Sequence, residues 1–147
     1  MQRAGAPRAA PSAPLDAENA PIRSGRHGMA ARMPQPSALV TGANGFLGSR
    51  LVRHLVERGE HVKAFVRAGS NIDSLRGLPE DQVTIAVGDI QSAHTVYRAL
   101  LGCNRVYHVA SNFVFWDRKP ERILNPAIVG TRAVLEAAAE RKIKKVV

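Results

Sequence analysis

The chain has 147 residues, the length of one domain, and its hydrophobic content of 45% is enough to form a core. The formal net charge is +9, and the single cysteine, Cys103, excludes a disulfide framework and a cysteine-based zinc site. No stretch reaches the ~18 apolar residues that a membrane span needs, and the lone cysteine favours a reducing, cytoplasmic setting.

Residues 1–36 differ in composition from the rest of the chain. They are rich in Ala, Pro and Arg and have no sustained hydrophobic period, so they cannot bury enough apolar area to offset the entropy of ordering. We therefore predict a disordered tail over 1–36 and a folded domain over 37–147. Asp16 and the proline density disfavour an organellar transit peptide, and Met29 and Met33 leave open a later start of translation.

From Ser37 onward, apolar strand-like segments alternate with amphipathic helix-like segments. The strands are predicted at 37–41, 61–67, 83–89, 104–111 and 143–147, and the helices at 46–59, 92–102 and 125–142. This alternation predicts a parallel sheet covered by helices on both faces, an α/β doubly wound fold. The last predicted strand only begins, so the fold is expected to be truncated there.

Hydrophobic spacing predicts which side of each long helix faces the sheet. In the first helix the expected stripe is Leu47, Leu51 and Leu55, with Val52 and Val56 beside it. Gly59 suits the position just past the helix end.

The third helix is expected to begin at Asn125, a capping residue, with Pro126 in the first turn. Its inward residues are then Ile128, Leu135 and Ala139. In the second helix, Ser92 can be the N-cap.

The stretch ALVTGANGFLGSR (38–50) places three glycines, Gly42, Gly45 and Gly48, between the first strand and the first helix. Gly42 allows a backbone conformation barred to a Cβ, Gly45 leaves room for a pyrophosphate, and Gly48 allows close packing of the helix on the sheet. The helix N-terminus would then face the anion. The alternative is a tight turn without a ligand, and a P-loop is excluded because no Gly-Lys-Ser/Thr follows.

The segment VTGANGFLGSRLVRHLVERG resembles the opening of the extended short-chain dehydrogenase/reductase family, whose fingerprint is TGxxGxxG. The likeness continues through VGDI (87–90), YHVAS (107–111) and NPAIVGTRAVLEAA (125–138), and thus covers 37–147. Within this Rossmann-fold family, the chain is most similar to dihydroflavonol 4-reductase-like proteins and hopanoid-associated sugar epimerases. Ala127 stands where many members have Asn, which favours the dihydroflavonol reductase side.

The resemblance implies a set of cofactor contacts. Asp89 and Ile90 would lie near the adenine, although Asp89 could equally cap a helix. The other contacts implied are Gly42, Asn44, Gly45, Phe46, Leu47 and Gly48 around the pyrophosphate, and Val109, Ala110 and Ser111 beside the nicotinamide ribose.

Arg67 ends the second strand, where an NAD site usually has an acidic residue. A guanidinium can bind a 2′-phosphate through two parallel hydrogen bonds, so we predict a preference for NADP over NAD, with Ser70 and Asn71 adding contacts. The alternative is an ordinary solvated strand end.

Two further features follow the fourth strand. His108 could shuttle protons, but a buried, hydrogen-bonded structural role is favoured because it lies in an apolar strand. The aromatic residues Phe113, Phe115 and Trp116 either line a substrate pocket or pack over the sheet edge.

The family's catalytic residues are a Ser and a Tyr-x-x-x-Lys pair, and this chain has neither. Its two tyrosines, Tyr97 and Tyr107, are followed four residues later by Leu101 and Ser111, and the resemblance puts the serine just after Val147. No catalytic residue is therefore assigned.

The resemblance implies the NAD(P)-binding portion of an oxidoreductase or epimerase that acts on a small secondary alcohol or ketone. The alternative is a catalytically silent dinucleotide-binding or redox-sensing protein. Nucleic-acid binding is disfavoured because the basic residues are scattered and no recognition motif accompanies them. The oligomeric state is not predicted.

Overall fold

The computed structural model describes residues 38–111 and 118–147, which all belong to one compact unit, Arg32–Val147. The predicted tail, 1–36, and the aromatic residues Phe113, Phe115 and Trp116 lie outside the described residues. The described elements, in chain order, are β1 (Ala38–Thr41), α1 (Phe46–Glu57), β2 (Val62–Val66), the short 3₁₀ helix η1 (Asp73–Leu75), β3 (Val83–Val87), α2 (Ala93–Ala99), β4 (Arg105–His108), α3 (Glu121–Glu140) and β5 (Lys145–Val146).

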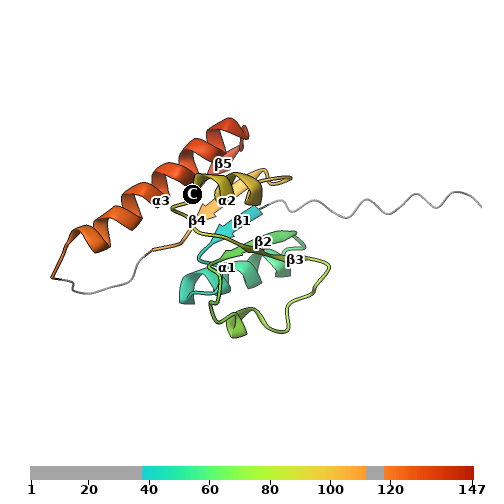
Figure 1. The fold of residues 1–147 in the computed structure, drawn as a ribbon. Coiled ribbons are helices and arrows are strands. Elements are labelled where there is room, and N and C mark those ends of the chain that lie inside the picture. The colour runs from blue at the N-terminus through green and yellow to red at the C-terminus, as the bar shows by residue number, and fades with distance from the viewer. Residues whose placement is uncertain (1–37, 112–117) are drawn as a thin grey trace, which may run out of the picture. The chain divides into compact units, whose positions relative to one another are not determined.

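The five strands form one parallel sheet in the order β3-β2-β1-β4-β5 (Figure 1). β1 lies at the centre, where Ala38 pairs with Val62 of β2 on one side and with Arg105 of β4 on the other. The chain adds strands outward in one direction and then crosses over to add them in the other, as a doubly wound fold does. The predicted fold class is confirmed.

Two apolar clusters cover the two faces of the sheet. On one face, Val52 and Leu55 of α1 pack with Val40 and Ala64 of the sheet. The cluster on the other face joins side chains of the sheet to side chains of α2 and α3, and its members include Leu39, Phe65, Val106, Val96, Leu100, Val134 and Ala137. All four residues of β1 are buried because the strand is covered on both faces, as its uninterrupted apolar run predicts.

The first helix differs from its predicted stripe at one end. Leu55 and Val52 are buried as expected, but Leu47 is 63% exposed. Leu47 lies in the first turn of α1, next to the loop, so it extends past the edge of the sheet. Gly59 follows the helix with φ +76°, which confirms its expected role at the helix end.

The third helix begins earlier than predicted. Its N-cap is Pro120, and both Asn125 and Pro126 lie inside the helix. Pro126 removes one backbone N–H from the helical ladder, at a place where the neighbouring Asn125 and Ala127 are exposed.

The inward face of α3 also differs from the prediction. Ile128 and Leu135 are 55% and 51% exposed, and Ala139 is exposed. The buried residues are small or medium-sized: Gly130, Ala133, Val134, Ala137 and Ala138. Small residues allow close approach; a Cβ on Gly130 would lie 2.7 Å from the Ile90 side chain.

Within 38–111 and 118–147, none of the helices has the length and apolar character needed to cross a membrane.

Candidate dinucleotide site

The glycine loop lies where the carboxyl ends of β1 and β4 meet. β1 pairs with β2 on one side and with β4 on the other. The helix that follows β1 packs on one face of the sheet, and the helix that follows β4 packs on the opposite face. In open α/β sheets, ligands bind at the carboxyl ends of the strands, at such a reversal of strand order.

Gly42 makes the loop possible. Its φ is +64°, in the left-handed region, and a Cβ there would lie 2.8 Å from the Cα of Ala110. The loop backbone therefore approaches the chain that follows β4, and a side chain at position 42 would separate the two. Gly42 has the conformation predicted for it.

Gly48 packs against the loop itself. A Cβ on Gly48 would clash with the carbonyl oxygen of Gly42 and lie 2.9 Å from the Cα of Ala43. The sequence predicts that Gly48 allows the helix to pack closely on the sheet. In the structure, the tight contact of Gly48 is with the backbone of the loop, at Gly42 and Ala43. A methyl group in place of an α-hydrogen of Gly48 would push α1 and the loop apart.

The N-terminus of α1 is open to a ligand. Gly45 is the N-cap, with no side-chain cap hydrogen bond, and the first turn has no acidic residue. A Cβ on Gly45 would have only the Gly42 carbonyl oxygen, at 3.3 Å, within contact distance. The first-turn N–H groups have no partner within the helix, and with the helix dipole they favour an anion.

The other predicted residues of the loop differ in their contacts. Phe46 is 85% exposed and Arg50 lies over its ring, 5.9 Å from the centroid. Leu47 is exposed as well. Asn44 is half-buried, and its amide nitrogen donates to the carbonyl oxygen of Asn71 at 2.9 Å. Asn44 therefore joins the glycine loop to the segment that follows β2.

Arg67 stands directly after β2 and is exposed. A turn follows, in which the Ser70 N–H donates to the Arg67 carbonyl at 3.1 Å and Gly69 has φ +72°. The nearest acidic residue further along, Asp73, pairs with Arg76 at 2.8 Å. In the described part of the chain, no carboxylate forms an ion pair with the Arg67 guanidinium.

Asp89 follows β3 and is exposed. Its Oδ1 accepts a hydrogen bond from the Gln91 N–H at 2.8 Å, whereas the N-cap of α2 is Ser92. Asp89 thus closes a local turn and does not cap the helix. Ser92 has the predicted N-cap position but makes no side-chain cap hydrogen bond. Ile90 is half-buried and packs in the cluster with α2 and α3.

A chain of side-chain hydrogen bonds connects the tips of β1 and β4 to α3. Thr41 Oγ1 lies 2.8 Å from His108 Nδ1, and His108 Nε2 lies 3.2 Å from Thr131 Oγ1. The Ala110 N–H donates to Thr41 Oγ1 at 3.1 Å. His108 is half-buried, and burial lowers the pKa of its imidazole. Its hydrogen bonds support the structural role favoured from the sequence.

The residues predicted beside the nicotinamide ribose follow this tip. Val109 and Ala110 are half-buried and Ser111 is exposed. Ala110 is the residue that Gly42 approaches, so the segment predicted to lie beside the nicotinamide ribose contacts the glycine loop.

Neither tyrosine lies free at this edge. Tyr97 belongs to α2, and the guanidinium of Arg141 lies 3.7 Å from its ring centroid. Tyr107 lies within β4 and packs against the cluster under α1.

Sequence reasoning missed Arg53 and Ser74, which link α1, the loop and the segment after β2. No period or motif marks a contact between these two residues, which are 21 positions apart. Thr41 and Thr131 were inside recognised motifs but had no assigned partner.

Comparisons with known proteins agree with this geometry. A model of the 3-beta hydroxysteroid dehydrogenase/isomerase family matches residues 39–147. Dihydroflavonol 4-reductase of Callistephus chinensis is 35% identical over 119 residues, which are 76% of this chain and 33% of that protein. The chain spans about a third of the length of the curated relatives it matches.

Solved structures share the same arrangement. The crystal structure of gox2253 has a TM-score of 0.68 and 35% sequence identity, and the match covers 76% of this chain and 33% of that one. A UDP-glucose 4-epimerase of Thermus thermophilus, solved with NAD, has a TM-score of 0.61. At 24% identity over 75% of this chain and 36% of that one, this second likeness shows the fold alone.

Proposed function

Because the chain belongs to the 3-beta hydroxysteroid dehydrogenase/isomerase family, we propose that it binds NADP(H) as the cofactor-binding portion of an oxidoreductase. The substrate would be a small molecule with a secondary alcohol or a ketone, as in a dihydroflavonol reductase. A sugar epimerase is the second reading of the same family likeness.

The conformation of the glycine loop carries this proposal. Gly42 and Gly48 allow a turn that brings the N-terminus of α1 to the tip of β1. Gly45 leaves that N-terminus without a side chain, so a pyrophosphate could contact the backbone N–H groups directly. A turn that only joined strand to helix would not need an uncapped helix end free of acidic residues.

Arg67 supports NADP over NAD. Arg67 is exposed directly after β2, the place where such sites bind the ribose, and the first acid after it, Asp73, is already paired with Arg76. A free carboxylate there would accept from the ribose 2′-OH and repel a 2′-phosphate. Ser70 and Asn71 can add hydrogen bonds to the same phosphate.

The remaining cofactor contacts are proposed at the ends of β3 and β4. Asp89 is exposed, and the carboxylate oxygen that does not bind Gln91 can accept from the adenine amino group. Ile90 would contact the adenine ring. Val109, Ala110 and Ser111 are small, which would let the nicotinamide ribose lie close to the strand tip.

Arg67→Glu tests the choice of cofactor. NADPH and NADH are titrated into full-length wild-type and variant protein, with Arg98→Glu, an exposed position on α2, as the charge-matched control. We expect NADPH affinity to fall at least about tenfold relative to NADH, since a charged hydrogen bond is lost and replaced by repulsion. An unchanged ratio of NADPH to NADH affinity in Arg67→Glu would show that Arg67 does not select the cofactor. Failure of the wild-type protein to bind either dinucleotide would overturn the proposed function.

A silent dinucleotide-binding or redox-sensing protein is the second candidate. The packing of both tyrosines of this chain is compatible with it, Tyr97 under Arg141 and Tyr107 within β4. Such a protein would bind NADPH with the same residues and show no turnover even at full length.

A further inference from the structure

We propose that Arg53 of α1 is a positioning residue of the cofactor site, which holds the segment 71–76 against the glycine loop and thereby shapes the wall facing the 2′-phosphate. This inference rests on the proposed NADP(H) binding. It adds a residue that need not touch the cofactor.

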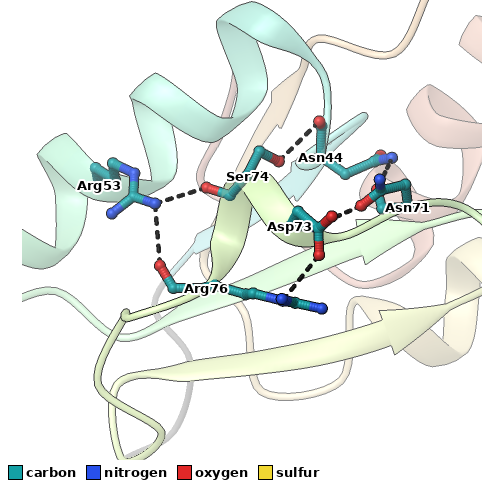
Figure 2. A network of polar contacts seen from close by, with 6 residues as sticks. All are labelled: Asn44, Arg53, Asn71, Asp73, Ser74 and Arg76. Carbon is teal, nitrogen blue, oxygen red and sulfur yellow. Dashed lines mark hydrogen bonds and ion pairs between the residues drawn. The ribbon is translucent and has the colours of Figure 1, made fainter.

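Arg53 holds two backbone carbonyls of this segment, as Figure 2 shows. One terminal nitrogen of its guanidinium donates to the Ser74 carbonyl at 2.7 Å and to the Arg76 carbonyl at 3.1 Å. Arg53 is half-buried on the body of α1. The helix whose N-terminus would face the pyrophosphate therefore also fixes the segment after β2.

The segment in turn forms two hydrogen bonds with the glycine loop. The Ser74 hydroxyl donates to the Asn44 carbonyl at 2.9 Å, and the Asn44 amide nitrogen donates to the Asn71 carbonyl at 2.9 Å (Figure 2). Asn44 lies between Gly42 and Gly45, so these bonds act on the loop proposed to hold the pyrophosphate. The loop and the segment cannot shift independently while both bonds are kept.

The same segment leads directly back to Arg67. The Ser70 N–H bonds to the Arg67 carbonyl, and Asn71 Oδ1 accepts from the Asp73 N–H at 2.7 Å. The chain from Arg67 to Asp73 thus contains two local hydrogen bonds, one at each end. A displacement of Ser74 is passed to Ser70 and Asn71, the residues proposed to assist Arg67.

The segment has other anchors besides Arg53. Leu75 is buried against the α1 side of the core and would hold the segment near the helix. The Asp73–Arg76 pair has both side chains more than half exposed, so it contributes little. Without Arg53, the Ser74 and Arg76 carbonyls lose this donor, and the segment is held to the rest of the site by Leu75 and its two hydrogen bonds with Asn44.

The test is a double-mutant cycle in the full-length protein. Arg53→Met keeps the length of the side chain and removes its donors, and Arg67→Gln removes the proposed selector. We expect Arg53→Met to lower the NADPH:NADH affinity ratio about three- to tenfold, and to have less than a twofold effect on that ratio in the Arg67→Gln background, as for coupled neighbours. Arg53→Lys, which keeps one charged donor group, should restore part of the ratio.

Arg58→Met is the matched control, because it removes the same charge from the exposed end of α1. Equal loss of NADPH and NADH affinity in Arg53→Met would overturn the inference and leave Arg53 a merely stabilising residue. So would an unchanged ratio, or, where Arg67→Gln itself lowers the ratio, a full effect of Arg53→Met in the Arg67→Gln background. If Arg67→Gln alone leaves the ratio unchanged while Arg53→Met lowers it, the proposed role of Arg67 fails and the positioning role of Arg53 stands through Ser70 and Asn71.

Discussion

Each glycine of the loop makes a different physical contribution, and this difference can be measured. Gly48 has no room for a methyl group because the Gly42 carbonyl occupies that space, whereas at the exposed Gly45 a Cβ would meet only the Gly42 carbonyl oxygen, at 3.3 Å, a contact that a small shift relieves. Their roles therefore separate into packing for Gly48 and ligand approach for Gly45.

We expect Gly48→Ala to lose both stability and cofactor binding. The added methyl group must push α1 away from the loop, at a cost of about 1–3 kcal/mol in the free energy of unfolding, as for overpacked sites. Gly45→Ala should change that free energy by only about 0.5 kcal/mol and still weaken NADPH binding about tenfold or more, if a pyrophosphate approaches there. Urea unfolding and NADPH titration of both variants give the comparison, and a Gly45→Ala protein with wild-type affinity would contradict a pyrophosphate at this place.

At the scale of elements, His108 joins β1, β4 and α3 through Thr41 and Thr131. Burial lowers the pKa of the folded-state imidazole, while the unfolded state titrates near the usual value of about 6.5. Between these two pKa values the unfolded chain binds more protons than the folded chain. Stability from this site is therefore complete above about pH 6.5 and falls as the pH is lowered through the folded-state pKa.

We expect His108→Gln to reduce this pH dependence. Urea unfolding at pH 8, 7, 6 and 5 should show the wild type losing more stability than the variant below about pH 6.5, since glutamine can bond both threonines without titrating. His94→Gln, at an exposed position of α2, should keep the wild-type profile. Parallel profiles for wild type and His108→Gln would exclude a linkage through His108.

The sequence predicts these elements well and their contacts less well. The parallel sheet and the glycine conformations follow from period and residue type, as at Gly42 and Gly59. The inward face of α3 was predicted wrongly, because a search for large apolar residues selects Ile128 and Leu135, whereas close packing on the sheet and α2 selects Gly130 and Ala137. Hydrophobic spacing identifies large apolar residues, whereas the packing of α3 depends on small ones.

In the candidate site too, features marked by a local pattern could be predicted, and contacts between distant side chains could not. The glycine loop is visible in a local motif, and Arg67 in its place after the second strand. The Arg53–Ser74–Asn44 connection depends on side chains that meet only after α1 and η1 have packed together, so no local pattern announces it. The same holds for Thr41–His108–Thr131, whose members are 67 and 23 residues apart.

At the scale of the whole chain, the proposed cofactor contacts are present without the family's Tyr-x-x-x-Lys pattern. The described residues supply the loop, the helix N-terminus and an exposed Arg67, but neither tyrosine has a lysine four residues on. General acid–base catalysis needs a group within hydrogen-bond reach of the reacting oxygen. Tyr97 is stacked under Arg141 and Tyr107 is packed within β4, so neither fulfils this role.

We therefore expect the 147-residue chain to bind NADPH without transferring hydride. NADPH oxidation is followed by its near-ultraviolet absorbance with a panel of ketones, in parallel with a titration of binding, and the Gly48→Ala variant controls for adventitious binding. Binding without turnover is the expected result, because His108, the titratable group at the tip of β4, is engaged by two threonines and burial favours its neutral form. Ketone-dependent oxidation of NADPH by this chain would mean that a proton donor other than the family's tyrosine acts at this edge of the sheet.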